Sequence, residues 1–446
     1  MREMVEQLSV SRAGMNAVIF ALLWALMASA MLLESDTYRY VSIVLVVFAV
    51  VWQRDGIRRV SRDWLAVACY VWAFYTAGRF FYGVFVAGEK GTSEWLYIFP
   101  AVFPLVGVAL YATRAYIFPG ATLTVVVGFV ALVATLNPAV IIAGERAAPL
   151  FHHNPIHAGI GSCMLFLTSV FWLLYAAETG RLKGRFKFPM VGLGVLTPIL
   201  SLFGALGAHS KGAWLALVFV MALMAILALL HYAGRWRLHL LGGLLLTAVA
   251  VALISASYVE KVAGPTIEAA AKLTDDTVAT EGPIASMQRA IVDPATPSSM
   301  RERLKLWSNA IELIQAAPFV GWGNEWLREW RKTTYADVGF TLIHNGYLEI
   351  MVRHGILGMA FLLVFVATAV RRINAAHSGG LISSSLTAYL YSLSFFFFCT
   401  ITTNSNNRLA LGESFFILGA AAVFAISLAQ EDRMRGEHEE RLAQPV

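Results

Sequence analysis

The segment 344–349 brings together residue types that can move a proton. It reads His-Asn-Gly-Tyr-Leu-Glu and directly precedes a long apolar run. Asn345 is a favourable N-cap, so His344 is expected just before a helix start, where the positive end of the helix dipole disfavours imidazolium. A neutral imidazole near pH 7 can serve as a general base. The sequence therefore offers His344 as a base supported by Asn345, Tyr347 and Glu349, with a capping or structural histidine as the alternative interpretation.

Cations in two other segments suit an anionic substrate. Lys211 follows His209 and Ser210 directly before another apolar run, where it could bind an anion or simply extend from the membrane interface to water. Arg79 lies inside an apolar run. An ionisable side chain is costly there, so Arg79 either binds substrate or belongs to a structural ion pair.

A third cation, Arg303, lies in a predicted amphipathic helix. Ser299 and Glu302 have the spacing of a capping box at its start. Its apolar stripe follows helical spacing and consists of Leu304, Trp307, Ile311 and Ile314. At roughly 100° per residue, Arg303 is about 60° from the stripe centre, Arg301 about 100° and Lys305 about 140°. Arg303 is therefore the cation best placed to face inward.

Other patterns for metal or phosphate chemistry are weak. His152, His153 and His157 are closely spaced, but no carboxylate or cysteine ligand is expected near them, and His157 is expected on the following helix. Asp275 and Asp276 are adjacent, whereas metal-holding acidic pairs are spaced, and the chain has no Walker-type phosphate loop. We therefore expect no metal and no cofactor.

Composition places these residues in a membrane protein. The 446 residues are 58% hydrophobic and 14% charged, whereas soluble domains have roughly 45–50% and 25%. Apolar runs near the roughly 20 residues needed to cross a bilayer recur along the chain. The net charge of +6 fits an excess of Lys and Arg in cytoplasmic loops, so no nucleic-acid partner is expected.

The predicted architecture is an all-α integral membrane protein with about 12 transmembrane helices and one large helical loop. Spans are expected at 15–33, 38–52, 63–83, 94–111, 117–136, 156–177, 188–206, 212–231, 238–258, 346–370, 381–403 and 409–429. The chain thus divides into a first helical part at 1–258, a loop at 259–343, a second helical part at 344–430 and a tail at 431–446. The distribution of Lys and Arg places both termini and the tail in the cytoplasm and the loop outside.

The outward position of the candidate residues restricts the chemistry. No nucleotide-sugar or ATP pool is expected there, so a group-transfer enzyme needs a donor that the membrane delivers with its own leaving group. A lipid diphosphate meets this requirement. Its charge calls for Arg and Lys, and its tail calls for a lateral opening between helices.

Three segments together resemble the O-antigen ligase and polymerase superfamily. The segment 209–214 resembles its Ser-Arg-Gly element, 303–307 with 317–323 resembles its arginine–tryptophan helix and Pro-x-x-Gly-x-Gly turn, and 344–349 resembles its histidine motif. Their order, their spacing and the large late loop also match. Lys211 departs from the usual arginine, which keeps the charge but loses the bidentate fork. Arg146, followed by Asn154-Pro155, resembles a looser element of the family.

The resemblance implies a GT-C-like glycosyltransferase of a bacterial inner membrane. Such a protein moves a glycan from undecaprenyl diphosphate to an acceptor at the periplasmic face, and for an O-antigen ligase the acceptor is lipid A–core oligosaccharide. It implies that Arg303, Lys211, Arg79 and Arg146 bind the diphosphate. An O-antigen polymerase or a protein-glycosylating ligase would share this chemistry. A transporter of lipid-linked glycans is an alternative of another class, which the gathering of cations at one face and the lack of paired repeats disfavour.

Overall fold

The chain folds into helices throughout. A computed structural model describes residues 2–89, 92–232, 234–278, 282–339 and 342–443. Helices make up 82% of the described residues, which hold no strand beyond an isolated bridge between Leu33 and Phe151. This confirms the predicted all-α class.

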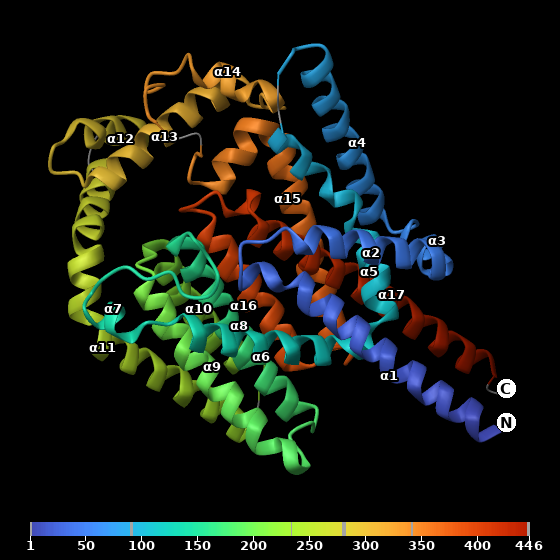
Figure 1. Ribbon diagram of the computed structural model, residues 1–446. Helices are drawn as coiled ribbons and strands as arrows, with labels where there is room; N and C mark the ends of the chain where they lie inside the picture. Colours follow the sequence, from blue (N-terminus) through green and yellow to red (C-terminus); the bar gives the residue numbers. More distant parts are fainter. Residues whose placement is uncertain (1, 90–91, 233, 279–281, 340–341, 444–446) are drawn as a thin grey trace.

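The described residues form helices α1 to α17, most of them connected by short turns (Figure 1). The first eight are α1 (Arg2–Met27), α2 (Thr37–Trp52), α3 (Arg54–Val60), α4 (Trp64–Phe85), α5 (Phe103–Ala112), α6 (Ile117–Thr135), α7 (Pro138–Ile142) and α8 (Pro155–Glu178). The others are α9 (Lys187–Gly207), α10 (Lys211–His231), α11 (Gly234–Asp276), α12 (Gly282–Val292), α13 (Ser298–Ala316), α14 (Trp326–Trp330), α15 (Gly346–Ser378), α16 (Ser384–Thr400) and α17 (Ala410–Ala443).

Several of these helices can cross a membrane. By length and composition, seven helices in the described part of the chain qualify, namely α6, α8, α9, α10, α11, α15 and α17. The count becomes eight if α2 and α3, which meet at an angle of 101°, form one broken span. The protein is therefore a multi-pass membrane protein, but the predicted count of about 12 spans is not confirmed.

The remaining predicted spans differ from regular long helices for local reasons. The apolar part of α1 is short, Gly14–Met27, and a 3-10 turn follows it at Ser29–Met31. The predicted span 94–111 is divided into the 3-10 segment Thr92–Ala101 and α5, with Pro100 near the junction, because proline has no N–H for the helical ladder. Helix α4 forms where predicted but is not among the seven long apolar helices.

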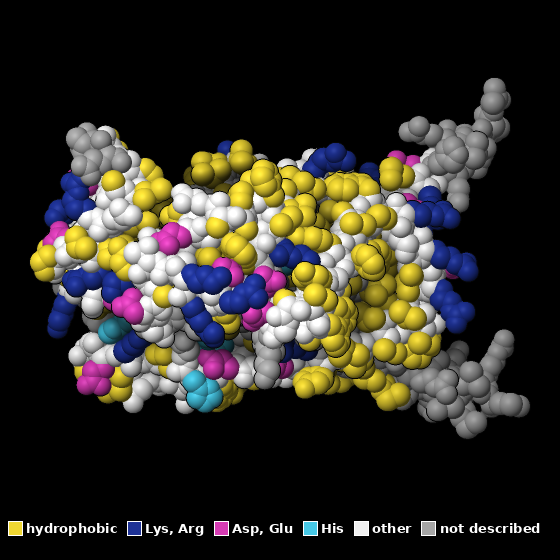
Figure 2. Space-filling view, turned by 90° about the horizontal axis from the view of Figure 1, so that it is seen from above, with side chains coloured by type: hydrophobic (Ala, Val, Ile, Leu, Met, Phe, Trp, Pro, Cys, Tyr) yellow, Lys and Arg dark blue, Asp and Glu magenta, His cyan; other side chains and the backbone are white. Residues whose placement is uncertain are grey.

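Two buried clusters hold the helices together. One centres on α8, which is the most buried of the seven long apolar helices, and it includes residues of α6, α9, α10 and α16. The other joins α1, α2, α4, α5 and α17. On the outside, Figure 2 shows a broad, hollowed apolar area beside Lys and Arg side chains, at the end of the molecule that carries both termini in Figure 1.

Helix α11 is far longer than predicted. We expected its span to end at residue 258, yet the helix continues to Asp276 and has 43 residues. The continuation is rich in Ala, Glu and Lys, which favour helix, so the end of the apolar run does not end the helix. No residue of the apolar part Trp236–Leu253 is buried. This part of α11 therefore lies at the edge of the bundle, where one side, including Leu244, packs on its neighbours and the rest is exposed to lipid.

The large loop carries the helices that we predicted there. Figure 1 places α12, α13 and α14 at the end of the molecule opposite the two termini. Leu306, Leu313, Trp326 and Trp330 of this region form a core with Val352 of α15. The loop is thus packed onto the membrane helices. That it faces the periplasm remains a prediction.

Candidate functional site

His344 lies directly before α15, as predicted. The side chain of Asn345 caps this helix, because it accepts hydrogen bonds from the backbone N–H of Tyr347 at 3.0 Å and of Leu348 at 3.1 Å. His344 itself has a positive φ of 53°, which is uncommon for a residue other than glycine. The chain thus makes a sharp change of direction at the histidine.

The surroundings of His344 favour the neutral imidazole. Burial lowers its pKa, and the charge of Arg303 lowers it further. The charge of Glu349 and a hydrogen bond with the side chain of Asn404 act in the opposite direction without reversing the effect. We expected this direction from the helix dipole, but the main cause is removal of the ring from water.

Arg303 is directed into the protein from α13. It lies two turns before Ala310, on the face whose side chains Leu306, Ala310 and Leu313 are buried. Burial lowers the pKa of Arg303, but a guanidinium remains charged at any physiological pH. No carboxylate of the described residues is recorded in an ion pair with it. An inward-facing arginine without such a partner is suited to an incoming anion.

The neighbouring cations of α13 are engaged locally. Arg301 donates to the backbone carbonyls of Thr296, at 2.9 Å, and Pro294. Lys305 forms an ion pair of 3.2 Å with Glu302. The capping box that we predicted at Ser299 is absent, because the N-cap of α13 is Pro297, two residues earlier, and Ser299 lies within the helix.

Lys211 is the first residue of α10 and lies near Arg303. The two positive charges are close enough to repel each other. The Nζ atom of Lys211 donates a hydrogen bond of 2.8 Å to Oγ1 of Thr266 on α11. Gly212 packs so tightly on Thr403 that a Cβ atom would collide with the threonine hydroxyl, and Asn404 lies next to it. The segment 403–404 therefore connects Lys211 to His344.

Arg79 contacts the backbone of the site region. Its guanidinium donates to the backbone carbonyls of Val320, Gly321 at 3.0 Å and Arg353 at 3.2 Å. These carbonyls belong to the turn after α13 and to α15. The Arg79 side chain thus joins the turn after α13 to α15. These hydrogen bonds occupy several of the N–H donors of its guanidinium.

The last predicted cation and the supporting residues are placed as follows. Arg146 is exposed and donates to the carbonyl of Ala208 at 3.3 Å, beside His209. Burial lowers the pKa of His209, and the charge of Arg146 adds to this effect.

The Tyr347 hydroxyl donates to the carbonyl of Phe398 at 3.0 Å, which anchors α15 to α16.

Glu349 is fully buried one turn into α15. Nε of Arg353 donates to its Oε1 at 3.2 Å, and the guanidinium of Arg353 lies 4.7 Å from the centre of the Trp326 ring. This arrangement joins α15 to α14. It also holds a negative charge close to His344, because the charge of Glu349 acts on the pKa of that histidine.

Sequence reasoning missed Asn404, Thr266 and Arg353. Asn404 lies in the polar run 402–407 between two apolar runs, and this run was a usable signal. Thr266 had none, because it lies inside an ordinary helical segment. Arg353 is one helical turn after Glu349, so the i, i+4 spacing could have indicated the pair.

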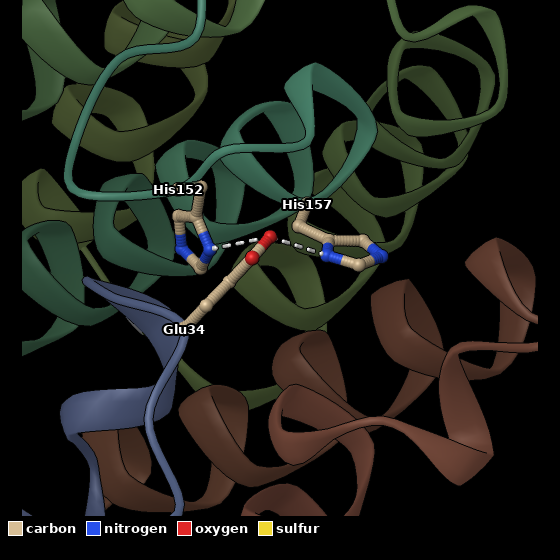
Figure 3. A group of neighbouring side chains, drawn as sticks. All are labelled: Glu34, His152 and His157. Atoms are coloured by element: carbon tan, nitrogen blue, oxygen red, sulfur yellow. Dashed lines mark hydrogen bonds and ion pairs between the residues drawn. The ribbon is translucent and has the colours of Figure 1, made fainter.

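Our argument that no carboxylate lies near the histidines of the 151–157 segment was wrong. Figure 3 shows His152 and His157 directed toward Glu34, which lies more than a hundred residues earlier in the chain. Nδ1 of His157 is 2.9 Å from Oε1 of Glu34, and Nδ1 of His152 is 3.9 Å from the same atom. As predicted, His157 lies on the helix, in the first turn of α8.

An apolar cavity extends along α15 from the neighbourhood of the site. Asn407, which packs on Gly346 at the start of α15, lines it at one end. Most of the wall residues belong to α15 and α17, with further ones from α4, the 92–101 segment, α5 and α16. They include Ile350, Phe361, Phe365, Ile373, Phe416 and Val423. The backbone of α15 is not helical at Gly355, and from Gly358 to Ile373 its wall is about 22 Å long at roughly 1.5 Å per residue, most of the roughly 30 Å hydrocarbon core of a bilayer.

Residues 196–363 match the family model described as O-antigen ligase. The matched segment contains Lys211, Arg303 and His344. This segment of the chain is therefore similar to an O-antigen ligase domain. No curated protein matches the chain. The O-antigen ligase family implies glycosyl transfer of the ligase or polymerase type, with lipid-linked glycans as substrates and membrane lipid around the protein.

Proposed function

We propose that this member of the O-antigen ligase family is an O-antigen ligase of a bacterial inner membrane. It transfers a glycan from undecaprenyl diphosphate to lipid A–core oligosaccharide, with inversion at the anomeric carbon and without a metal. Both termini are cytoplasmic and the site is periplasmic. The observation that supports the proposal is that the 403–404 segment packs on Gly212, next to Lys211, and bonds to His344 through Asn404, while Arg303 is directed inward from α13. Two cations thus lie beside a histidine that is kept neutral.

In the proposed reaction, His344 takes the proton of an acceptor sugar hydroxyl. The hydroxyl oxygen forms a bond to the anomeric carbon while the bond from that carbon to the diphosphate oxygen breaks. The electron pair of the broken bond stays on the leaving diphosphate, and the proton remains on His344 until water takes it. A positioned general base typically contributes about 10²–10⁴-fold to a rate.

Arg303 and Lys211 bind the diphosphate in this proposal. The leaving diphosphate gains negative charge, and cations held in place before the reaction stabilise that charge without having to reorganise. No general acid is required, because diphosphate is a good leaving group. Arg146, exposed beside His209, is assigned to the approach of the donor rather than to its reacting phosphate.

The apolar cavity along α15 supports a lipid donor. Its walls carry aromatic and aliphatic side chains, which suit a polyprenyl chain. Its polar end is near the start of α15, next to His344. A donor with its tail in this cavity and its diphosphate at Arg303 would bring the anomeric carbon to His344.

Deletion of the gene and analysis of lipopolysaccharide by gel tests the proposal. An O-antigen ligase predicts loss of the O-antigen ladder while lipid-linked polymer accumulates. Single repeat units on the core would instead identify a polymerase, and loss of glycan from a protein would identify a protein-glycosylating ligase. Absence of transfer by purified protein from a lipid-linked donor to a lipid A–core acceptor would contradict the assignment and favour a transporter.

A further inference from the structure

Glu34, His152 and His157 form a side-chain cluster that the proposed reaction does not use. Backbone pairing brings them together. The N–H of Phe151 donates to the carbonyl of Leu32 at 2.9 Å. This contact brings Glu34, two residues after Leu32, close to His152, the residue after Phe151. His157 adds its ring from the first turn of α8 (Figure 3). One ligand atom of each residue lies within 4.8 Å of the other two.

The orientation of His152 directs its Nδ1, an acceptor in the neutral ring, toward Oε1 of Glu34, which is also an acceptor. Its Nε2 is 3.1 Å from the carbonyl oxygen of Met31. A carbonyl can only accept, so Nε2 carries the hydrogen and Nδ1 of the neutral ring has a lone pair. The side chain is 1% exposed, and Nδ1 is buried without a hydrogen-bond partner among the described residues. The nearest charged atom recorded for it is Oε1 of Glu34, 3.9 Å away.

A lone pair of a buried ring nitrogen that faces a carboxylate oxygen is stabilised by a cation between the two atoms. The contact of His152 with the Met31 carbonyl is also the arrangement that orients metal-binding histidines in known sites. In a tetrahedral zinc site with bonds of about 2.0–2.1 Å, neighbouring ligand atoms are about 3.3 Å apart. The separations of 2.9 and 3.9 Å from Glu34 Oε1 lie on either side of that value.

We propose that Glu34, His152 and His157 bind a divalent transition-metal ion, with Zn²⁺ as the best fit to two imidazoles and one carboxylate. Water supplies the fourth ligand, since the carboxylate of Glu34 remains 33% exposed and the site is open on that side. His153 is not required. Its ring is 94% exposed, although its Nδ1 lies 3.5 Å from Oε2 of Glu34.

The role of this ion is structural. It ties the segment after α1 to the start of α8. Gly159 of α8 packs on Ala208 and Ser210, and Gly161 packs on the Met31 carbonyl and the His152 ring, so a Cβ atom at either position would crowd these groups. The cluster is therefore connected through α8 to the segment 208–210, which leads to Lys211. The ion stabilises the position of this segment without contacting the reacting groups.

Metal analysis of the purified full-length protein tests this proposal. Protein in detergent is stripped with a chelator, dialysed, loaded with Zn²⁺ alone and freed of excess ion. We expect one zinc per chain in the wild type and in the exposed control His153→Ala. We expect the ion to be lost in Glu34→Gln and in His152→Ala. Zinc content in the two site variants equal to that of the wild type would overturn the proposal.

Thermal unfolding gives a second measurement that is independent of transfer activity. Zn²⁺ should raise the Tm of the wild type and of His153→Ala by a few degrees, because an ion that binds only the folded state stabilises it. Glu34→Gln should show no rise, and this variant serves if His152→Ala fails to fold. Co²⁺ should give the visible absorption of a tetrahedral site in the wild type but not in Glu34→Gln. No Tm rise and no such absorption in the wild type would identify a hydrogen-bonded cluster without metal.

Discussion

The Nζ atom of Lys211 donates a 2.8 Å hydrogen bond to Oγ1 of Thr266, which links the start of α10 to the part of α11 beyond its apolar segment. A hydroxyl partner holds the ammonium in place but leaves its charge uncompensated. An aspartate or glutamate at position 266 would have neutralised it. The position of this cation therefore depends on a helix that sequence inspection would not connect with the site.

Substitutions of Lys211 and Thr266 separate charge from positioning. Lys211→Ala should lower the transfer rate by about 10²-fold, as for loss of one preorganised charge-stabilising donor, whereas Lys211→Arg should be tolerated. Thr266→Val removes the hydrogen bond and keeps the volume, so we expect only a few-fold loss. Rates are measured with purified protein and a lipid-linked donor. Equal losses in Thr266→Val and Lys211→Ala would show that position rather than charge matters.

Arg303 should be the essential cation of α13. Arg303→Ala should abolish transfer and weaken donor binding at normal protein levels, because its guanidinium is directed inward. Arg301→Ala and Lys305→Ala are matched controls on the same helix, and their charges are engaged with Thr296 and Glu302. Both controls should keep most of the activity. Full activity in Arg303→Ala together with loss in Arg301→Ala would refute the assignment.

His344 should act in its neutral form, so the transfer rate of the wild type and that of His344→Ala should depend differently on pH. Since the pKa of His344 is lowered, the ring is neutral at pH 7, and transfer should decline only when the pH falls through a value below the ordinary one of about 6.5. His344→Ala should express normally, bind donor, and transfer about 10²–10⁴-fold more slowly without this acidic decline. A purely structural histidine predicts reduced protein amount instead. Retention of anomeric configuration in the product would exclude the single displacement.

Transfer itself should need no divalent ion. We expect activity of the wild type to survive EDTA at a temperature well below its Tm. Glu34→Gln, which lacks a proposed zinc ligand, should also transfer at that temperature while unfolding at a lower one. Loss of transfer in EDTA that Mg²⁺ or Mn²⁺ restores would instead require an ion at the diphosphate.

Arg79 should support the fold more than it binds the donor. Arg79→Ala removes hydrogen bonds to the carbonyls of Gly321 and Arg353 and leaves these groups without a donor, which costs about 1–3 kcal/mol for each buried group. We expect a lower Tm, with near-normal donor affinity of the protein that remains folded. A large rise in the donor Kd with an unchanged Tm would restore Arg79 as a diphosphate ligand.

Local patterns predicted some parts of the site and could not predict others. The cap at Asn345 depends on a few neighbouring residues, so spacing alone was sufficient. The predicted apolar stripe of α13 is not its most buried face, because Leu306, Ala310 and Leu313 are buried whereas Trp307 and Ile311 are half-buried against α12. Asn404, Thr266 and Glu34 meet their partners only through the packing of distant helices, and no local pattern encodes that. The fold class followed from hydropathy, but the bounds of α11 did not, because apolar length indicates where lipid ends and not where a helix ends.

The unbroken course of α11 gives the bilayer a mechanical connection to the site. Most of the surface of its apolar part Trp236–Leu253 is exposed to lipid, and the part that follows Pro265 holds Nζ of Lys211 through Thr266. A hydrophobic segment responds to a thicker or thinner bilayer by tilting. Because the helix continues past the membrane, such a tilt moves Thr266 as the end of a lever. A change of acyl-chain length in reconstituted vesicles should therefore shift Thr266, and with it Lys211 in the proposed donor site, without any ligand.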